Sequence, residues 1–377
     1  MKVGWQTKTI GEVCDIINGS TPLRSNKAYW ENGNINWFTI EDIREQGRKI
    51  NRTNQKITHH ALEKTSVRIL PSKSVLLCCT ASIGEYAITE APMATNQQFN
   101  GLVVKNQQTL EPLFLFHFCA TMKDKLAELS GKTTIDFIPI SRLRDILIPV
   151  PPIPEQQRIV TILDEAFEGI AIATANAEKN LANARELFES YLQSIFTNRA
   201  NDWDLKSIGS VIKLEYGKPL DRADRTNNGQ YPVYGANGEK SRTSKFYYDK
   251  ESIIVGRKGS AGEINLSEEK FWPLDVTYFV TYDNNQNELM FLYYLLGSLK
   301  LPLLAKGVKP GINRNEVYAL TARFPDLATQ KTTVAKLGEL SAEIKGLEAI
   351  YQQKLMTLDE LKKSLLNRAF AGELTHV

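Results

Sequence analysis

The strongest constraint on the fold is an internal repeat that is held at a single offset. The segment PPIPEQQRIVTILD at residues 151–164 is echoed by PDLATQKTTVAKLG at residues 325–338, which begins 174 positions later. The same offset places RELFESYLQSIF at residues 185–196 over DELKKSLLNRAF at residues 359–370. One offset that is held along both segments is hard to obtain by chance, so we interpret the chain as an internal duplication.

Both repeated segments predict a long helix. Each follows a proline-rich stop, and no proline interrupts either one. Apolar residues recur at steps of three or four, from Leu163 to Ile195 in the first copy and from Val334 to Ala369 in the second. This spacing forms the single apolar stripe of a coiled coil. A lone striped helix has no core, so we expect the two helices, each roughly 60 Å long, to pack together as a spacer.

The parts of the chain before the two helices also repeat, more loosely. WQTKTIGEVCDIINGSTP at residues 5–22 resembles WDLKSIGSVIKLEYGKP at residues 203–219, and CTASIGEYAI at residues 79–88 resembles RKGSAGEINL at residues 257–266. Short β-branched and aromatic runs lie between Gly, Asn and Pro turns in both parts. These patterns predict two related α+β domains, here called heads, each with a substantial sheet.

The sequence therefore predicts four segments in a chain of 377 residues. The first head is expected at residues 1–150 and the second head at residues 201–324. A central long helix is expected at residues 151–200, and a C-terminal long helix that pairs with it at residues 325–377. The fold class is α+β, with two β-rich heads separated by two long helices.

Composition argues against a membrane protein and against a metal site. No apolar run approaches the roughly twenty residues of a membrane span, and the first residues lack the apolar core of a signal peptide, so we expect a cytoplasmic protein with no membrane partner. The four cysteines are expected to be buried, reduced thiols. Cys78 and Cys79 are adjacent, which is not a chelating spacing, and the histidines form no ligand pattern with them.

A glycine-rich segment raises the alternative of a nucleotide-binding enzyme. IIVGRKGSAGEINL at residues 253–266 places three glycines after a strand-like run. A phosphate-binding Walker loop needs Gly-Lys-Ser/Thr at its end, whereas here Lys258 precedes the turn and Glu263 follows it. The first copy keeps the final glycine and the glutamate, with Thr80 and Ala81 set against the Arg-Lys pair. The segment is therefore interpreted as a β-turn that both heads share.

No pattern of catalytic residues stands out in the sequence. Paired carboxylates, a Ser/His/Asp set and the Asn/Asp-Pro-Pro-aromatic loop of methyltransferases are all missing, and four histidines offer little for general-base catalysis. We therefore predict a binding protein with no catalytic residues and no cofactor of its own.

Polar and basic side chains on the loops of the heads predict a nucleic-acid interface. The net charge of +3 is weak evidence by itself. Arginine, asparagine and glutamine can read base edges, while lysine and arginine hold phosphates. The candidates in the first head are Arg24, Lys27, Asn96, Gln97, Gln98 and Lys132. The candidates in the second head are Lys218, Arg222, Asn237, Lys240, Arg242, Arg257, Lys258, Lys306, Lys309, Asn313 and Arg314.

The whole chain resembles the DNA-specificity subunits of type I restriction–modification systems. The resemblance is carried by PPIPEQQRIVTILD, by DELKKSLLNRAFAGEL, and by the head motifs GSTPLRSNKAYWENGNINWFTIEDI and YPVYGANG. It implies two target-recognition domains on an antiparallel coiled-coil spacer, which read the two halves of an interrupted target in double-stranded DNA. Half-sites that are read from one side of the duplex lie on the order of 35 Å apart.

The resemblance also implies partners. The helices would dock two methyltransferase subunits, which carry S-adenosylmethionine and methylate adenine, and motor-nuclease subunits would join the full complex. The second copy has Thr329 and Thr332 where the first has Glu155 and Arg158, so the two docking contacts need not be equal. Two alternatives remain, namely a coiled-coil scaffold with protein-binding heads and an enzyme that binds a nucleotide at glycine loop 256–262.

Overall fold

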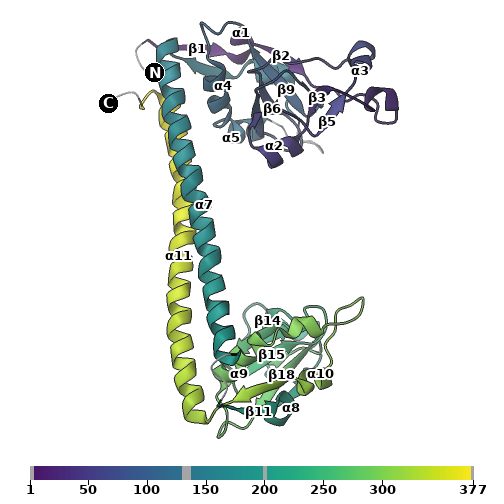
Figure 1. The fold of residues 1–377 in the computed structure, drawn as a ribbon, viewed down its shortest axis with the longest axis vertical. Coiled ribbons are helices and arrows are strands. Elements are labelled where there is room, and N and C mark those ends of the chain that lie inside the picture. Colours follow the sequence, from purple (N-terminus) through teal and green to yellow (C-terminus); the bar gives the residue numbers. More distant parts are fainter. Residues whose placement is uncertain (1–3, 130–136, 198–201, 375–377) are drawn as a thin grey trace. The chain divides into compact units, whose positions relative to one another are not determined.

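The computed structural model describes residues 4–129, 137–197 and 202–374, and Figure 1 shows their fold. The chain forms two compact units, each of which contains one head together with parts of both long helices. The first unit consists of Met1–Asn176 and Lys354–Val377, and the second unit of Ala177–Gln353.

The first head is built on a five-stranded sheet, a three-stranded sheet and one further strand pair. The five-stranded sheet has the order β2 (Cys14–Asn18), β9 (Phe99–Val104), β6 (Val75–Cys78), β7 (Tyr86–Thr89) and β4 (Lys49–Ile50). The three-stranded sheet has the order β5 (Gln55–Ile57), β3 (Ile35–Phe38) and β8 (Ala94–Thr95), and β1 (Gln6–Thr9) pairs with β10 (Leu147–Val150). The helices are α1 (Ile10–Val13), η1 (Lys27–Tyr29), α2 (Ile40–Gln46), α3 (His59–Lys64), α4 (Pro112–Cys119), α5 (Lys123–Leu129) and α6 (Ile140–Arg144).

The central strand β6 lies between two of the apolar clusters of this head. All four of its residues are buried, and a pleated strand points successive side chains to opposite faces. Val75 and Leu77 therefore join the large apolar cluster that includes α4, while Leu76 and Cys78 join a second cluster around Phe38. An unbroken apolar run is what a strand covered on both faces requires.

The second head repeats this construction. Its four-stranded sheet has the order β12 (Ile212–Tyr216), β18 (Thr277–Tyr282), β15 (Ser252–Gly256) and β16 (Ile264–Ser267). Its three-stranded sheet has the order β14 (Gly238–Thr243), β13 (Tyr231–Gly235) and β17 (Trp272–Pro273), and β11 (Asp204–Ser207) pairs with β19 (Thr321–Phe324). The helices are α8 (Ile208–Val211), η2 (Arg222–Asp224), α9 (Leu289–Ser298), η3 (Leu301–Leu304) and α10 (Arg314–Ala319).

The two heads share one topology, which confirms the looser sequence repeat. The order β12-β18-β15-β16 matches β2-β9-β6-β7, and β14-β13-β17 matches β5-β3-β8. In both three-stranded sheets the last pairing is parallel, at β13–β17 and at β3–β8. The first head adds β4, which pairs in parallel with β7. The duplication seen in the sequence is therefore a duplication of the fold.

Two helices of 45 residues each, α7 (Ile153–Thr197) and α11 (Leu327–Ala371), confirm the predicted spacer helices. In the first unit, Leu163 near the start of α7 shares a buried cluster with Leu366 near the end of α11. In the second unit, Leu192 near the end of α7 shares a cluster with Leu337 near the start of α11. The helices are therefore antiparallel within each unit (Figure 1).

A buried glutamine ties the first turn of each long helix to its head. Gln156 Oε1 accepts a hydrogen bond from the Glu111 N–H at 2.8 Å, and its Nε2 donates to the carbonyls of Thr109 and Pro151 at 2.9 and 2.7 Å. Gln330 makes the corresponding bonds with Glu288, Gln286 and Pro325. The bonded segments lead directly into α4 and α9, so the glutamines fix each helix against its head.

The described part of the chain contains no helix that is both long and apolar enough to cross a membrane. Within residues 4–129, 137–197 and 202–374, His, Cys, Asp and Glu side chains nowhere gather in a group of three that could hold a metal ion. The four cysteines are buried free thiols. Burial raises the pKa of Cys14 to about 12 and that of Cys79 to about 11, so these thiols are protonated at neutral pH.

Candidate nucleic-acid interface

The glycine-rich segment forms a tight turn between the antiparallel strands β15 and β16, and no helix follows it. Gly262 has φ of +84°, and a Cβ there would lie 2.4 Å from the Pro302 nitrogen, so only glycine fits. In the first head, Gly84 occupies the same turn with φ of +86°. A turn that leads into a strand lacks the helix N-terminus on which Walker-type phosphate binding depends.

Backbone hydrogen bonds correct the pairing of residues within this turn. The Arg257 carbonyl accepts from the Ile312 N–H at 3.0 Å, and the Cys79 carbonyl accepts from the Ile138 N–H at the same distance. Arg257 is therefore equivalent to Cys79, and Lys258 to Thr80. The alignment of residues 79–88 with 257–266 agrees with this equivalence, whereas the pairing of the Arg-Lys pair with Thr80 and Ala81 was wrong by one residue, because it departed from that alignment.

The second head brings four segments of the chain together at one end of its sheet. The Gly217 N–H donates to the Thr277 carbonyl at 3.1 Å, and the Arg257 N–H donates to the Val276 carbonyl at 2.8 Å. The turn after β15 is then joined to loop 306–311, because the Gly259 N–H donates to the Pro310 carbonyl at 2.9 Å. The end of β12, the segment before β18, the turn and the loop, with Asn313 and Arg314 just after the loop, thus form one surface, here called the basic end.

Two arginines of the basic end share one aromatic ring. The guanidinium carbon of Arg257 lies 5.2 Å from the centroid of the Tyr216 ring, and that of Arg314 lies 5.0 Å from it. Tyr216 is 45% exposed, and its ring packs on that of Tyr278 at 5.1 Å between centroids. Cation–π contacts of this kind hold the guanidinium groups in place while leaving their N–H groups free to donate.

The other cations and amides of the basic end are more loosely held. Lys258 and Lys309 are exposed. Lys306 forms an exposed ion pair with Glu316. The Asn313 side chain accepts a hydrogen bond from the Asn315 N–H at 2.9 Å and caps α10, so its role is at least partly structural.

The remaining candidates of the second head differ in how they are engaged. Lys218 is exposed, with its Nζ 5.0 Å from the centroid of the Tyr247 ring. Asn237 is exposed in the tight turn between β13 and β14. Lys240 and Arg222 are exposed as well. These four side chains are accessible to a ligand.

Arg242 is held by the protein itself. Its Nε donates to the Gly229 carbonyl at 2.9 Å, and its Nη2 donates to the Gln230 carbonyl at 2.7 Å and to Glu269 at 2.9 Å. A second carboxylate, Glu239, lies 3.3 Å from Nη1. The hydrogen bond with Glu269 further raises the pKa of Arg242. With its donors occupied, Arg242 braces the loop before β13.

The described residues at the equivalent end of the first head include three amides, of which Asn96 is buried. Asn96 Nδ2 donates to Gln98 Oε1 at 3.0 Å, and the Gln98 N–H donates back to Asn96 Oδ1 at 3.0 Å. Gln97 is exposed and accepts a hydrogen bond from the Thr21 hydroxyl. The Gln98 carbonyl accepts from the Cys79 N–H at 3.0 Å, which is the bond that Val276 and Arg257 form in the second head.

Arg24 of the first head is positioned by two indole rings. Its guanidinium carbon lies 4.0 Å from the Trp30 ring centroid and 4.6 Å from that of Trp37, and Nη1 donates to Gln55 Oε1 at 2.6 Å. Lys27, the first residue of η1, is exposed and pairs with Glu31, which lies just after this short helix. Lys132 lies outside the described residues.

Sequence reasoning missed the aromatic residues that hold the candidate cations, namely Tyr216, Tyr247, Trp30 and Trp37. A signal existed for Tyr216, because it stands directly before the repeated glycine of the YGKP motif. Trp30 lies only six residues after Arg24, whereas Trp37 and Tyr247 are farther along the chain from the cations that they contact.

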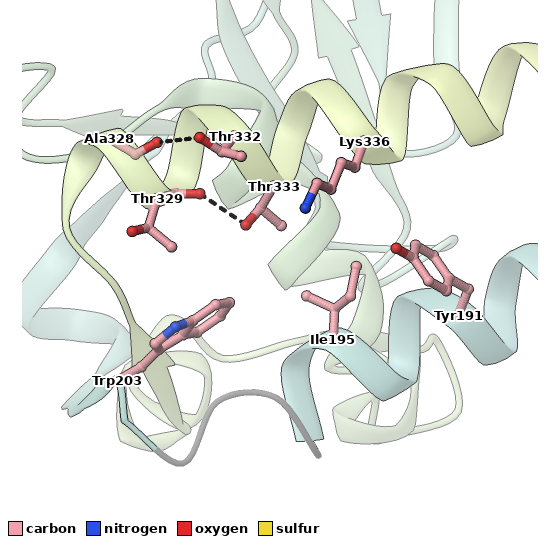
Figure 2. Close-up of a pocket in the computed structure, with 8 residues that line it drawn as sticks. All are labelled: Tyr191, Ile195, Trp203, Ala328, Thr329, Thr332, Thr333 and Lys336. Carbon is pink, nitrogen blue, oxygen red and sulfur yellow. Dashed lines mark hydrogen bonds between the residues drawn. The ribbon is translucent and has the colours of Figure 1, made fainter.

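A separate pocket of about 280 Å³ lies in the second unit, beside the start of α11 (Figure 2). It is lined by Tyr191, Ile195, Trp203, Ala328, Thr329, Thr332, Thr333 and Lys336. The Thr332 and Thr333 hydroxyls donate to the carbonyls of Ala328 and Thr329 at 3.0 and 2.8 Å, as Figure 2 shows. Of these lining residues, Lys336 is the one that extends a charged group into the space (Figure 2).

The first unit differs from the second at the position equivalent to this pocket. Glu155 stands there in the position of Thr329, and the Trp5 indole N–H donates to Glu155 Oε2 at 3.1 Å. A carboxylate and an indole therefore pair in the first copy, where the second copy has a threonine and an open pocket beside Trp203.

Comparison with known proteins identifies relatives along nearly the whole chain. The family described as "Type I restriction modification DNA specificity domain" matches residues 2–182 and 200–353. The EcoprrI specificity subunit of a type I restriction enzyme from Escherichia coli is 25% identical over 85% of this chain and 84% of its own length. The MjaIX specificity subunit from Methanocaldococcus jannaschii is 27% identical over 98% of this chain and 93% of its own length.

Solved structures show the same fold. One, from a study of complex assembly and conformational transition of the type I R-M system, has a TM-score of 0.83 at 19% identity and covers 99% of both chains. The HsdS subunit from Thermoanaerobacter tengcongensis has a TM-score of 0.64 at 19% identity, with 99% of this chain and 98% of that chain covered.

Proposed function

This chain belongs to the family of type I restriction–modification DNA-specificity subunits, and from this premise we propose which of its surfaces contact DNA. The function of the family is DNA specificity, and two related heads suit a target in two parts. We place the contact with one half-site on the basic end of the second head. The equivalent end of the first head would contact the other half-site.

This proposal rests on one observation, namely that the equivalent ends of the two heads share a backbone conformation but differ in their side chains. The two ends have the same turn, the same positive-φ glycine and the same hydrogen bonds around Arg257 and Cys79. Among the described residues, the first head nevertheless has the amides Gln97 and Gln98 there, beside the buried Asn96, while the second head has a cluster of cations. Two copies of one scaffold that differ in their donors and acceptors would select different base sequences.

Within the basic end, the cations would divide into two roles. Arg257 and Arg314 are held by the Tyr216 ring, and a positioned arginine fork can donate two hydrogen bonds to guanine in the major groove. Lys258 and Lys309 are exposed, and flexible lysines suit phosphate contacts that carry no sequence information.

We further propose that the chain is non-catalytic and acts through partners. Methyltransferase subunits would dock beside the long helices and would bring S-adenosylmethionine, and motor-nuclease subunits would join the full complex. The difference between Glu155 in the first copy and Thr329 in the second favours two docking contacts of unequal strength. A DNA-reading subunit needs no nucleotide site, and the β15–β16 turn provides none.

Co-expression with the methyltransferase subunit of the same cell, followed by sequencing of methylated adenines, tests the proposal. We expect methylation at one two-part sequence, and Arg257→Ala should relax the requirement at a base position in one half only. Lys250→Ala is the matched control, because Lys250 is exposed just before β15, at the opposite end of that strand from Arg257. Methylation without sequence preference in the unmodified complex would contradict the proposal.

A further inference from the structure

Val308 is the most exposed large apolar side chain in the described part of the chain, with a relative accessibility of 106%. It lies in the loop between Lys306 and Gly311, which two backbone hydrogen bonds of 3.0 Å close into a hairpin. Gly307, the residue before it, has φ of +93°, which turns the chain sharply at this point. Val308 and Lys309 therefore stand in the turn of a short hairpin.

The hairpin is braced against the rest of the basic end. The Pro310 carbonyl accepts from the Gly259 N–H at 2.9 Å, and the Ile312 N–H donates to the Arg257 carbonyl at 3.0 Å. Lys258 and Gly311 also form a β-bridge. The side chain of Val308 is thus held out from a supported scaffold, beside the arginines that we assign to base contacts.

Single exposed apolar residues are common on protein surfaces and need no explanation by themselves. The setting of Val308 is what distinguishes it, because lysines flank it at positions 306 and 309 and the hairpin adjoins Arg257 and Arg314. Exposure of the valine isopropyl group to water is unfavourable. Burial of this group against an apolar atom of the ligand that the cations attract would be favourable.

We propose that Val308 is a specificity-determining residue that contacts the C5-methyl group of a thymine in the major groove. This inference rests on the proposed function and assigns one base to one side chain. The thymine methyl is the apolar group that the major groove displays, and small apolar side chains recognise it by contact. Lys306 and Lys309 would hold the phosphates beside it.

The major groove is favoured over the minor groove on two grounds. The major groove, about 12 Å wide, admits a two-stranded hairpin, whereas the minor groove is only about 6 Å wide. The side chains that typically unstack bases from the minor groove are Phe, Leu, Ile, Met and Pro, and valine is not among them. Valine is short and β-branched, so it suits contact with a methyl group better than insertion between bases.

Deoxyuridine tests this contact, because it differs from thymidine only by lacking the methyl group. The chain is assembled with its methyltransferase subunit, and each thymidine of the mapped target is replaced in turn. We expect one position in one half-site to weaken binding about fourfold, the effect of losing contact with one methyl group. In the Val308→Ala complex the thymidine and deoxyuridine duplexes should bind equally well. Val308→Thr, which keeps one of the two methyl groups, should retain part of the preference.

Leu205→Ala is the control for removing an exposed apolar side chain, since Leu205 is 62% exposed on β11, and it should leave the thymidine preference unchanged. Equal binding of all deoxyuridine duplexes to the unmodified complex would overturn the role of Val308, as would a preference that persists in Val308→Ala. A loss of DNA bending in Val308→Ala without any deoxyuridine effect would indicate a minor-groove wedge and would also overturn it. Each of these results leaves site-specific methylation intact, whereas a failure of the proposed function would abolish it.

Discussion

Gln156 in α7 and Gln330 in α11 make the same three hydrogen bonds, although the residues on either side of them differ. Both amides are buried, with accessibilities of 0% and 1%. In each copy the carboxamide satisfies one N–H and two carbonyls at the place where a long helix leaves its head. The repeated glutamine is therefore a structural joint, and its identity follows from an amide's ability to donate and accept at once.

Replacing either glutamine with leucine should destabilise the unit that contains it. The change leaves a buried N–H and two carbonyls without their partner, so Gln156→Leu and Gln330→Leu should each lower the free energy of unfolding by about 2–4 kcal/mol. Urea denaturation followed by circular dichroism measures the loss. Gln157→Leu is the matched control because Gln157 is exposed, and its effect should be within about 0.5 kcal/mol. Equal losses of unfolding free energy in Gln156→Leu and Gln157→Leu would contradict the structural role of Gln156.

Alanine substitutions at Gly259 and Gly262, the two glycines with positive φ in the β15–β16 turn, should distinguish the cost of backbone strain from the cost of a steric clash. Gly259 has φ of +83° with open space around it, whereas a Cβ on Gly262 would meet the Pro302 nitrogen at 2.4 Å. Gly259→Ala should cost about 1 kcal/mol of stability, the penalty of the left-handed backbone. Gly262→Ala should cost at least about 2 kcal/mol more, because the backbone of η3 must also move. Thermal unfolding of both variants checks this order, and similar melting temperatures would show that the turn relaxes freely.

Lys309→Ala and Tyr216→Ala should affect DNA binding in different ways. Loss of a phosphate contact at Lys309 should weaken binding to all sequences alike and reduce the slope of log K against log salt by about one unit. Loss of the Tyr216 ring should release both arginines and relax sequence preference, while Tyr216→Phe, which keeps the ring, should preserve it. Fluorescence anisotropy at several salt concentrations distinguishes these effects. Unchanged binding in both alanine variants would place the DNA surface elsewhere.

Stability of the first unit should fall as the pH decreases toward and below the ordinary pKa of histidine. His117 is buried, and this burial lowers its pKa, although Asp164 at 2.8 Å opposes the shift and Lys49 and Lys362 add to it. Because the folded-state pKa lies below the unfolded one, the unfolded chain takes up the proton first. The contribution of His117 is thus present above about pH 6.5 and is lost as the pH falls toward its lowered pKa. Urea denaturation between pH 7.5 and 5 measures this, and His117→Gln should flatten the dependence. An identical pH profile for this variant would contradict the assignment.

Deleting seven residues from α7 alone should impair assembly or change the length of the DNA interval tolerated between half-sites. The deletion preserves the heptad phase of α7 but shifts its later half along α11. Sequencing of methylated adenines in the variant complex shows the outcome. Unchanged methylation at the original target would refute the idea that the helices set the spacing of the half-sites.

The repeat explains how much of the fold the sequence could predict. Helices of 45 residues follow from an unbroken apolar stripe, and one offset pairs Gln156 with Gln330. The composition of the basic end could be predicted only in part. Lys258 meets Gly311 through a β-bridge between segments that no periodicity links, so their proximity depends on the folded sheet.

Arg242 illustrates why the sequence alone could not assign a role to an individual candidate residue. In the sequence it is one more arginine in a polar stretch, equivalent to Arg257 as a candidate. In the fold it faces the carbonyls of Gly229 and Gln230 and the carboxylate of Glu269, all supplied by loops. Loop geometry depends on tertiary contacts and not on local propensity, so the sequence alone could not separate a bracing arginine from a DNA-reading one.

The equivalence of Arg257 and Cys79 has a consequence for how such a protein changes over generations. At both positions the main chain supplies the hydrogen bonds that hold the turn, and the side chain takes no part in them. Arg257 is partly exposed, so we expect point mutations at position 257 to alter the sequence that is read at little cost in stability, whereas Cys79 is buried in the core and a larger or charged residue there should destabilise the first head. In the second head, we therefore expect recognition to change through single substitutions at position 257 without a defect in folding.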